Sequence, residues 1–390
     1  MKIRINQNFL NECLVYCGIS MYLVVSMLST TFFSKFIPGS LVHLVSIISI
    51  FLIILHNINA TKNGVSFFGG LFIFGIMSLL IYLSLGSFQN YIYSLIIIFL
   101  LKDFDFNKLV KVVLPVIITV FVFIIVCSKL GIVQDYVEIS MFRIRHYLGF
   151  RYSLFSSTIM LNIVALYLYS KQELISYKSI IILSISVLWI YNQTGSRLTT
   201  LSSLLLILLI LLIKVFPNFL KKVQYSLMVL IPSYFIGAIL SYIVADNFMS
   251  AGNAILMLNN FLGGRIYLAS KSLYIYGFSW LGKNIQWVGN GLNAEGQRSS
   301  MSYLYVDNMY IQILQKFGFL YLIIFLTLFT VALYKLYRQK QFFLFLILSV
   351  LAFHAMIDDL TFNLHYNFFL LLLAYPFSVR SIKHVRSNSS

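Results

Sequence analysis

The feature that most constrains this chain is a series of apolar runs of about 20 residues, repeated along nearly its whole length. A helix of that length crosses the hydrocarbon core of a bilayer, and its backbone hydrogen bonds are all satisfied within the segment. The chain has 390 residues, of which 60% are hydrophobic and 10% charged. A β-barrel would show short alternating segments instead. We therefore predict an all-α, polytopic membrane protein.

The apolar runs predict about twelve transmembrane helices, at residues 12–33, 39–58, 66–85, 88–101, 109–128, 152–170, 179–193, 198–213, 226–245, 317–334, 341–357 and 362–379. The fourth run is short enough to be a half-span. The first follows two basic residues, Lys2 and Arg4, and no small-residue cleavage site comes after it, so we expect a retained signal anchor. The predicted organisation is an N-terminal bundle of about nine spans (1–245), a large extracytoplasmic loop (246–316), and C-terminal transmembrane helices with a cytoplasmic tail (317–390).

The distribution of charge predicts the orientation. With a cytoplasmic N-terminus, the inner segments hold 17 of the 28 basic residues and only four of the 11 acidic ones, as the positive-inside rule requires. Both termini are then cytoplasmic. The formal net charge of +17 is mostly this topological signal, so it gives no reason to expect a nucleic-acid partner. The three cysteines indicate neither a disulfide framework nor a metal site.

The basic residues on the predicted outer side are of a different kind. Six of these 11 are arginines, whereas 13 of the 17 inner ones are lysines. Arginine binds phosphate through a planar fork of donors and stays charged when partly desolvated. Arginines that snorkel to the interface or touch lipid headgroups are the structural alternative. The outer arginines are Arg143, Arg145, Arg151, Arg197, Arg265 and Arg298.

Further polar residues in the predicted outer segments need a reason. Asp307 precedes an apolar run and is a candidate N-cap. Asn308, Gln312 and Gln315 follow at helical spacing, which favours a polar cavity behind that cap. His354 and Asp358 are spaced i, i+4, so a metal site is one reading and a polar hairpin that partners the outer arginines is the other. The loop at 246–316 is rich in aromatic residues, which are typical both of interfacial anchors and of sugar stacking.

These features together resemble the superfamily of O-antigen ligases and Wzy-type O-antigen and capsular polysaccharide polymerases. The ligases carry His-Asn (or Ser/Gln), nine residues, Gly, two residues, then Gly/Thr/Tyr. Here Asp307 and Asn308 are followed by nine residues, Gly318, two residues and Tyr321, so only the proposed catalytic His is replaced. Stretches similar to those of the polymerases are "RHYLGF" (145–150), "TGSR" (194–197) and "VDNMY" (306–310), and the similarity in layout covers most of the chain.

The resemblance implies a GT-C-like, inverting glycosyltransferase of the bacterial cell membrane that needs no metal or other cofactor. The donor is a glycan on polyprenyl pyrophosphate, and the acceptor is a repeat unit on the same lipid. Chain-length regulator and flippase proteins are possible partners, beside membrane lipid. Asp307, Arg197 and Arg265 are then the expected catalytic residues. The expected substrate-binding residues are Arg143, Arg145, Arg151, Arg298, Asn308, Tyr310 and Gln312.

Two other functions stay open at the level of sequence. A ligase on the same fold would move a finished glycan to another acceptor, and Asp at position 307 argues against it. A transporter or lipid-linked oligosaccharide flippase would more often show internal repeats and broken helices at the midplane. A carboxylate beside arginines is also expected to have a lowered pKa, which would make Asp307 a poor base.

Overall fold

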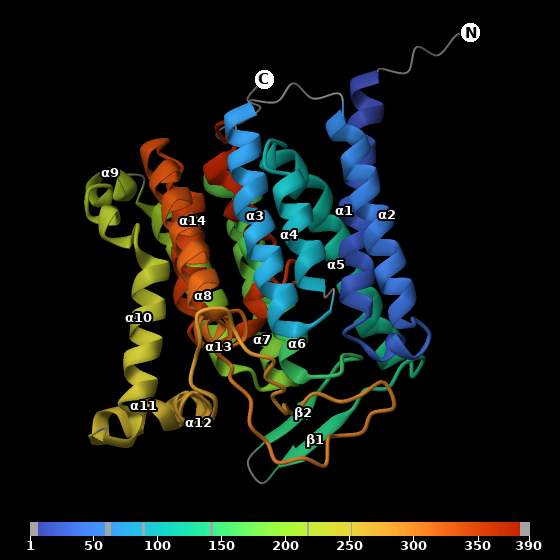
Figure 1. Cartoon of the computed structure of the whole chain (residues 1–390), viewed down its shortest axis with the longest axis vertical. Helices are drawn as coiled ribbons and strands as arrows, with labels where there is room; N and C mark the ends of the chain where they lie inside the picture. Colours follow the sequence, from blue (N-terminus) through green and yellow to red (C-terminus); the bar gives the residue numbers. More distant parts are fainter. Residues whose placement is uncertain are drawn as a thin grey trace.

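The computed structural model describes residues 7–58, 64–87, 90–140, 143–216, 218–250 and 252–382. These contain fifteen α-helices and one two-stranded antiparallel sheet (Figure 1). The predicted contributions of Lys2, Arg4, Lys62, Lys383 and Arg386 to the charge pattern lie outside the described residues. The helices are α1 (Gln7–Leu28), α2 (Gly39–Ile58), α3 (Gly64–Leu85), α4 (Asn90–Leu100), α5 (Phe106–Lys129), α6 (Ser153–Lys171), α7 (Tyr177–Thr194), α8 (Arg197–Val215), α9 (Phe219–Val223), α10 (Ser233–Asp246), α11 (Asn253–Phe261), α12 (Arg265–Tyr276), α13 (Met309–Lys316), α14 (Gly318–Arg338) and α15 (Phe342–His354).

The prediction of a helical, multi-pass membrane protein is confirmed. Seven of the described helices are long and apolar enough to cross a membrane, namely α1, α2, α3, α5, α6, α8 and α14. The shorter apolar helices α4, α10 and α15 and the 3-10 segment η6 (Phe368–Phe377) lie at four further predicted runs. The run at 179–193 corresponds to α7. Every predicted apolar run therefore coincides with a helical segment, and the fourth is as short as its sequence indicated.

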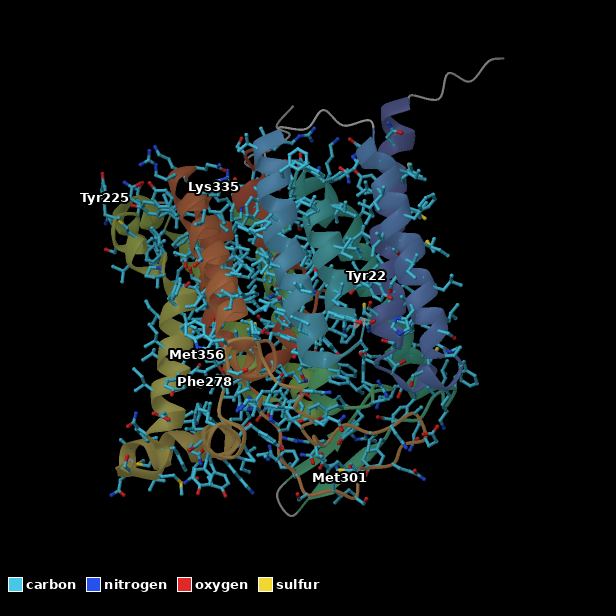
Figure 2. All side chains as sticks on the ribbon, in the orientation of Figure 1. Tyr22, Tyr225, Phe278, Met301, Lys335 and Met356 are labelled. Atoms are coloured by element: carbon cyan, nitrogen blue, oxygen red, sulfur yellow. The ribbon has the colours of Figure 1, made fainter. Side chains whose placement is uncertain are left out.

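The bundle has two chemically distinct ends, which we name by their contents. The hairpin end carries β1 (Val137–Ser140), β2 (Arg143–His146), α11, α12 and the irregular segment 277–308, all at the bottom of Figure 1. The lysine end lies opposite. Figure 2 labels Lys335 there, while Met301 lies at the hairpin end. Lys335 donates to the carbonyl of Pro376 at 2.6 Å, and Lys108 pairs with Glu12 at 2.6 Å. Lys108 and Lys335, which the sequence predicts on the inner side, therefore lie at the end opposite the hairpin.

Helix α6 forms the centre of the bundle. In the apolar window that contains it, 83% of residues are buried, against 22–50% for the other six long helices. It packs against α5, α7, α8 and α15. Its side chains are small or apolar on most faces, with serines at Ser153, Ser156 and Ser157 near the hairpin end, so neighbouring helices approach closely. The first turn of α6 consequently forms part of the floor of the hairpin end.

A glycine breaks the helix that follows Asp307 into α13 and α14. Gly318 has φ +93°, and a Cβ built on it would lie 2.4 Å from the carbonyl oxygen of Trp280 and from the amide nitrogen of Gly282. The segment 279–283 therefore lies directly against this backbone. Phe319 N donates to Ser279 O at 2.9 Å and Leu320 N donates to Trp280 O at 3.2 Å. These contacts fix the start of the irregular segment 277–308 to the helix that follows Asp307 in the chain.

Gly318→Ala is expected to lower the thermal stability of the purified protein sharply. The variant meets both the left-handed backbone penalty, about 1–2 kcal/mol, and a clash with fixed backbone atoms. Gly86→Ala is the matched control, because Gly86 also has positive φ, +68°, but a Cβ there meets nothing within 4 Å. Thermal unfolding of both variants in detergent measures the difference. Equal loss in the two would show that the loop does not pack against Gly318.

Candidate functional site

The structure brings two of the predicted catalytic residues together. Arg265 is the first residue of α12, and Asp307 lies just before α13. Nε of Arg265 donates to Oδ2 of Asp307 at 3.3 Å, and the two side chains are 16% and 11% exposed. A nearly buried charged pair is costly unless geometry is favourable, so such a pair needs a functional or architectural reason. It sits at the hairpin end, where α12 and α13 pack against α10.

Asp307 is not the helix cap, contrary to one reading of the sequence. The N-cap of α13 is Asn308, whose Oδ1 accepts from Ile311 N at 3.1 Å. The amide group of Asn308 also donates to Ser241 Oγ at 2.9 Å and to Met356 O at 2.7 Å. Because the next residue satisfies the helix terminus, the Asp307 carboxylate is left available for another role.

The polar stripe behind Asp307 does not line a cavity, which corrects the sequence interpretation. Gln312 donates to Val306 O at 2.8 Å. Gln315 donates to Ser272 O and Gly277 O at 3.0 and 2.9 Å, and so ties α13 to α12 and to the start of the long loop. Tyr310 points into the bundle, where its hydroxyl donates to Ala352 O at 2.6 Å. These side chains therefore hold the backbone that carries Asp307.

A cavity of about 260 Å³ opens beside Asp307. Its walls come from the start of α6, from the long loop and from the turn after α15, three regions that are far apart in sequence. The loop stretch "GNG" at 289–291, which reads first as a turn, forms part of this wall. The lining residues are Arg151, Tyr152, Leu154, Phe155, Gly289, Asn290, Gly291, Leu292, Tyr303, Tyr305, Asp307, Asp358, Asp359 and Leu360.

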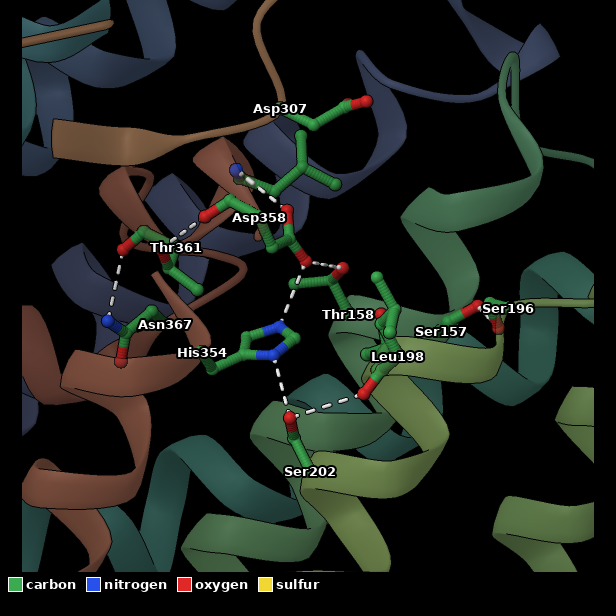
Figure 3. Close-up of polar contacts among 12 residues, drawn as sticks. Ser157, Thr158, Ser196, Leu198, Ser202, Asp307, His354, Asp358, Thr361 and Asn367 are labelled. Carbon is green, nitrogen blue, oxygen red and sulfur yellow. Dashed lines mark hydrogen bonds and ion pairs between the residues drawn. The ribbon is translucent and has the colours of Figure 1, made fainter. Parts of the chain in front are cut away.

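Asp358 is fixed in the wall of the cavity by a buried hydrogen-bond network (Figure 3). Its Oδ2 accepts from Thr158 Oγ1 at 2.7 Å and lies 3.1 Å from Nε2 of His354. Its Oδ1 accepts from Leu360 N at 3.0 Å. Nδ1 of His354 lies 2.9 Å from Ser202 Oγ, so both ring nitrogens have partners. The network joins α6, α8 and α15 beneath the cavity.

The metal reading of His354 and Asp358 gains no support from this arrangement. Among the described residues, no group of three or more His, Cys, Asp or Glu side chains is placed to hold a metal ion. The Ser202–His354–Asp358 connection also differs from a nucleophilic site, because Ser202 lies inside α8 and does not line the cavity. In Figure 3 the Asp307 carboxylate points away from His354 and from the network around Asp358. Asp307 and Asp358 therefore line the cavity from different sides.

The three acids of the cavity have different affinities for a proton. Burial raises the pKa of Asp307 more than Arg265 lowers it, so our expectation of a lowered pKa is wrong. Burial and the charges of Asp307 and Asp358 raise the pKa of Asp359 to about 8. Burial would raise the pKa of Asp358 too, but the hydrogen bonds from His354 and Thr158 outweigh burial, and the pKa of Asp358 is lowered. Environments that separate the pKa values of neighbouring acids are typical of acid–base sites.

Three predicted arginines form a row that extends from β2 to the α7–α8 turn. Arg143 and Arg145 lie on β2, with Arg145 3.8 Å from Glu138 across the hairpin. A Cβ on Gly195, in the turn, would lie 3.4 Å from Nε of Arg145 and 3.9 Å from Cδ of Arg143. Arg197 begins α8 directly after that turn. Burial and the like charges of Arg145 and Arg197 lower the pKa of Arg143, as expected where cations lie close together.

The last two predicted arginines have different surroundings. Arg298 donates to Glu138 Oε1 at 2.6 Å, on the outer side of the hairpin, and lies over the ring of Tyr136. Arg151 lines the cavity. Its Nη2 donates to Ser29 O at 2.9 Å, whereas its Nε is buried without a hydrogen-bond partner. Arg151 therefore belongs to the cavity, and Arg298 holds the loop to the hairpin.

The sequence also places Asp359 beside Asp358, and such paired carboxylates predict a raised pKa for one of the two. The structure confirms this for Asp359, to whose Oδ2 Tyr305 donates at 2.6 Å in the wall of the cavity. The residue missed from the sequence is Thr158, which holds Asp358 in place. Thr158 has no signal, because a threonine inside an apolar helix is ordinary.

No protein-family model, no curated protein and no solved structure matches this chain.

Asp359→Asn is expected to stabilise the protein increasingly as pH rises. The pKa of Asp359, about 8 in the fold, exceeds the ordinary value of about 3.9. The unfolded chain loses this proton first, so stability falls as pH rises between those two values and is constant above them. Asparagine removes this cost and retains an acceptor for Tyr305.

The expected gain in Tm is a few degrees, roughly 2 °C or more, at pH 8.5, and smaller at pH 5. The control is Asp246→Asn, at the exposed end of α10. Thermal unfolding in detergent at both pH values gives the comparison. A gain that does not grow with pH would contradict the raised pKa.

Proposed function

We propose that this protein is a polysaccharide polymerase of the bacterial cell membrane. In this proposal it has about twelve membrane-spanning segments with a GT-C-like arrangement, the hairpin end faces outward, and both termini are cytoplasmic. It transfers a polyprenyl-pyrophosphate-linked glycan to a lipid-linked repeat unit. The observation that carries the proposal is the row Arg145–Arg143–Arg197 near the Asp307–Arg265 pair, of which Asp307 lines the cavity.

The arginine row suits the leaving group of this reaction. Pyrophosphate gains negative charge as its bond to the sugar breaks, and preorganised cations stabilise that charge most in a site with little water. Glu138, the carboxylate that pairs with Arg145, also pairs with Arg298, so it is shared between the row and the loop. Arg145 also lies close enough to Asp307 to lower the pKa of that acid, although burial outweighs this effect. In this proposal the arginine row and the Asp307 carboxylate act at the same reaction centre.

Asp307 suits the role of base. The oxygen of the acceptor hydroxyl attacks the anomeric carbon, the bond from that carbon to the pyrophosphate oxygen breaks, and the hydroxyl proton passes to the Asp307 carboxylate. The configuration inverts. A base works best when its pKa lies near the working pH, and burial shifts the pKa of Asp307 in that direction. Arg265 holds the carboxylate in place.

The two other functions are less well supported by the site. A ligase would use the same pyrophosphate chemistry, and the products of a deletion strain distinguish it. Accumulated single-repeat lipid intermediates would indicate a polymerase, and long unligated polymer would indicate a ligase. A flippase needs a path for the glycan across the bundle, whereas the cavity and the arginine row both lie at the hairpin end.

Arg265→Ala is expected to abolish polymer in cells while the protein still inserts. Loss of a group that stabilises transition-state charge typically costs about 100-fold or more in rate. Arg265→Lys should restore little, since lysine lacks the fork of donors. Lys271→Ala, an exposed base on the same helix, is the control. Electrophoresis of the glycan from each strain gives the result. Normal chain lengths from Arg265→Ala would end the proposal, and Arg197→Ala provides a second test of the row.

Asp307→Asn is expected to stop polymerisation while the protein still inserts, with a lower Tm because Arg265 loses its charged partner. Asn308 remains the helix cap, so the substitution removes the carboxylate without removing the cap. The lipid-linked products of the strain, measured together with unfolding of the purified variant, separate chemistry from folding. Full polymerisation by the variant would show that Asp307 does not accept the proton.

A further inference from the structure

The lining of the cavity is rich in hydrogen-bond acceptors and poor in cations. Three carboxyl groups face it, from Asp307, Asp358 and Asp359, and among the described lining residues only Arg151 carries positive charge. Phosphate and carboxylate ligands need several donors and would be repelled by these oxygens. Sugar hydroxyls, in contrast, donate hydrogen bonds that carboxyl oxygens accept.

Apart from the loop stretch 289–291, which contributes the polar side chain of Asn290, the remaining walls are apolar or aromatic. Tyr152, Leu154 and Phe155 come from the start of α6, while Tyr303 and Leu360 complete the lining from the long loop and the turn after α15. The rings of Tyr152 and Phe155 meet edge to face at 5.6 Å, which fixes their orientation. Flat rigid surfaces of this kind pack well against the C–H face of a pyranose ring.

The donors and acceptors of the cavity are held in advance. The Tyr305 hydroxyl is committed to Asp359, so the position of that acid is set without a ligand. Arg151 is anchored by Ser29, and its Nε is buried without a hydrogen-bond partner. A buried donor without a partner is unfavourable and is satisfied when a ligand supplies an acceptor.

Size and position separate this cavity from the arginine row. Its volume of about 260 Å³ is below the range of about 300–1,000 Å³ typical of drug-sized ligands, which limits it to about one ring. Arg143, Arg145 and Arg197 are not among its lining residues. The site is therefore divided into a carboxyl-rich, aromatic compartment and a cationic one beside it.

We propose that the cavity is the binding site for a single neutral sugar ring, a hexose or N-acetylhexosamine, and that it excludes acidic sugars at that position. This inference rests on the proposed function, in which the arginine row holds the pyrophosphate and the cavity holds the sugar next to the reacting atoms. It adds a substrate class: the residue of the repeat unit that enters the cavity is uncharged.

Saturation-transfer NMR on the full-length protein in nanodiscs tests this directly, since it detects ligands that bind at millimolar affinity. The neutral probes are glucose, galactose, mannose, N-acetylglucosamine and N-acetylgalactosamine, and the acidic probes are glucuronic and galacturonic acid. We expect transfer to at least one neutral probe, and at least tenfold less to either acid. Absence of transfer to every neutral probe, or equal transfer to the acids, would overturn the inference.

A variant that fills the cavity locates the binding. Gly291 lines the cavity, and a Cβ there meets nothing within 4 Å, so Gly291→Leu adds bulk at the cavity with no clash at the Cβ. Gly75→Leu, on the exposed face of α3 and equally unobstructed, is the control. The neutral-sugar signal should fall at least fivefold in the first variant and persist in the second. An unchanged signal in Gly291→Leu places sugar binding elsewhere and overturns the inference.

These outcomes are independent of the polymerase proposal. If the Arg265 and Asp307 variants lose polymer but no neutral sugar binds, the polymerase proposal stands and the sugar cavity fails. If a neutral sugar binds in the cavity while those variants keep normal polymer, the cavity stands and the polymerase proposal fails.

Discussion

The nearly buried ion pair between Arg265 and Asp307 is the interaction on which the hairpin end depends. Neither charge has much access to water, so each relies on the other for its electrostatic stabilisation. The surrounding polar contacts keep the two residues within reach. Gln315 ties α13 to α12, Asn308 caps α13, and the close packing at Gly318 fixes the long loop behind them. The cavity, the row of arginines and the acids with shifted pKa values are arranged around this pair.

The separation of the three acids illustrates how one small region can hold carboxyl groups with different protonation. Asp358 receives hydrogen bonds from Thr158 and from a backbone amide and lies beside His354, and these favour its ionised form. Asp359 faces two other acids, which favours its protonated form, and the single hydrogen bond from Tyr305 offsets this only in part. All three acids are almost fully buried, so the difference arises from their hydrogen bonds and from the charges beside them. A site of this kind can bind hydroxyl groups and accept a proton without accumulating repulsive charge.

Sequence alone predicted the helical membrane fold, because apolar runs of bilayer length have few other solutions. It also placed Arg265 and Asp307 in one site, although 42 positions separate them, since both were polar residues expected on one side of the membrane. It failed where the answer depended on local geometry. Whether Asp307 or Asn308 caps α13 depends on a shift of one residue in where the helix begins. The role of Gln312 depends on the position of Val306 in the irregular segment before the helix. The cavity brings α6 together with the turn after α15, although about 200 positions separate them in the chain. A single sequence does not indicate which residues so far apart come into contact.

The contacts that hold Asp307 also determine when the site can exist during synthesis. Met309 N donates to Ala355 O at 2.9 Å, and Asn308 donates to Met356 O, so the segment around Asp307 is fastened to the end of α15. Asp358 and Asp359 follow immediately. A nascent chain that has made its first twelve helices already contains the arginines of the hairpin, α8 and α12. Asp307 follows them, but its fastening contacts at 355–356 and the other two acids belong to the last tenth of the chain. The cavity and its three acids are therefore completed only when synthesis is nearly finished.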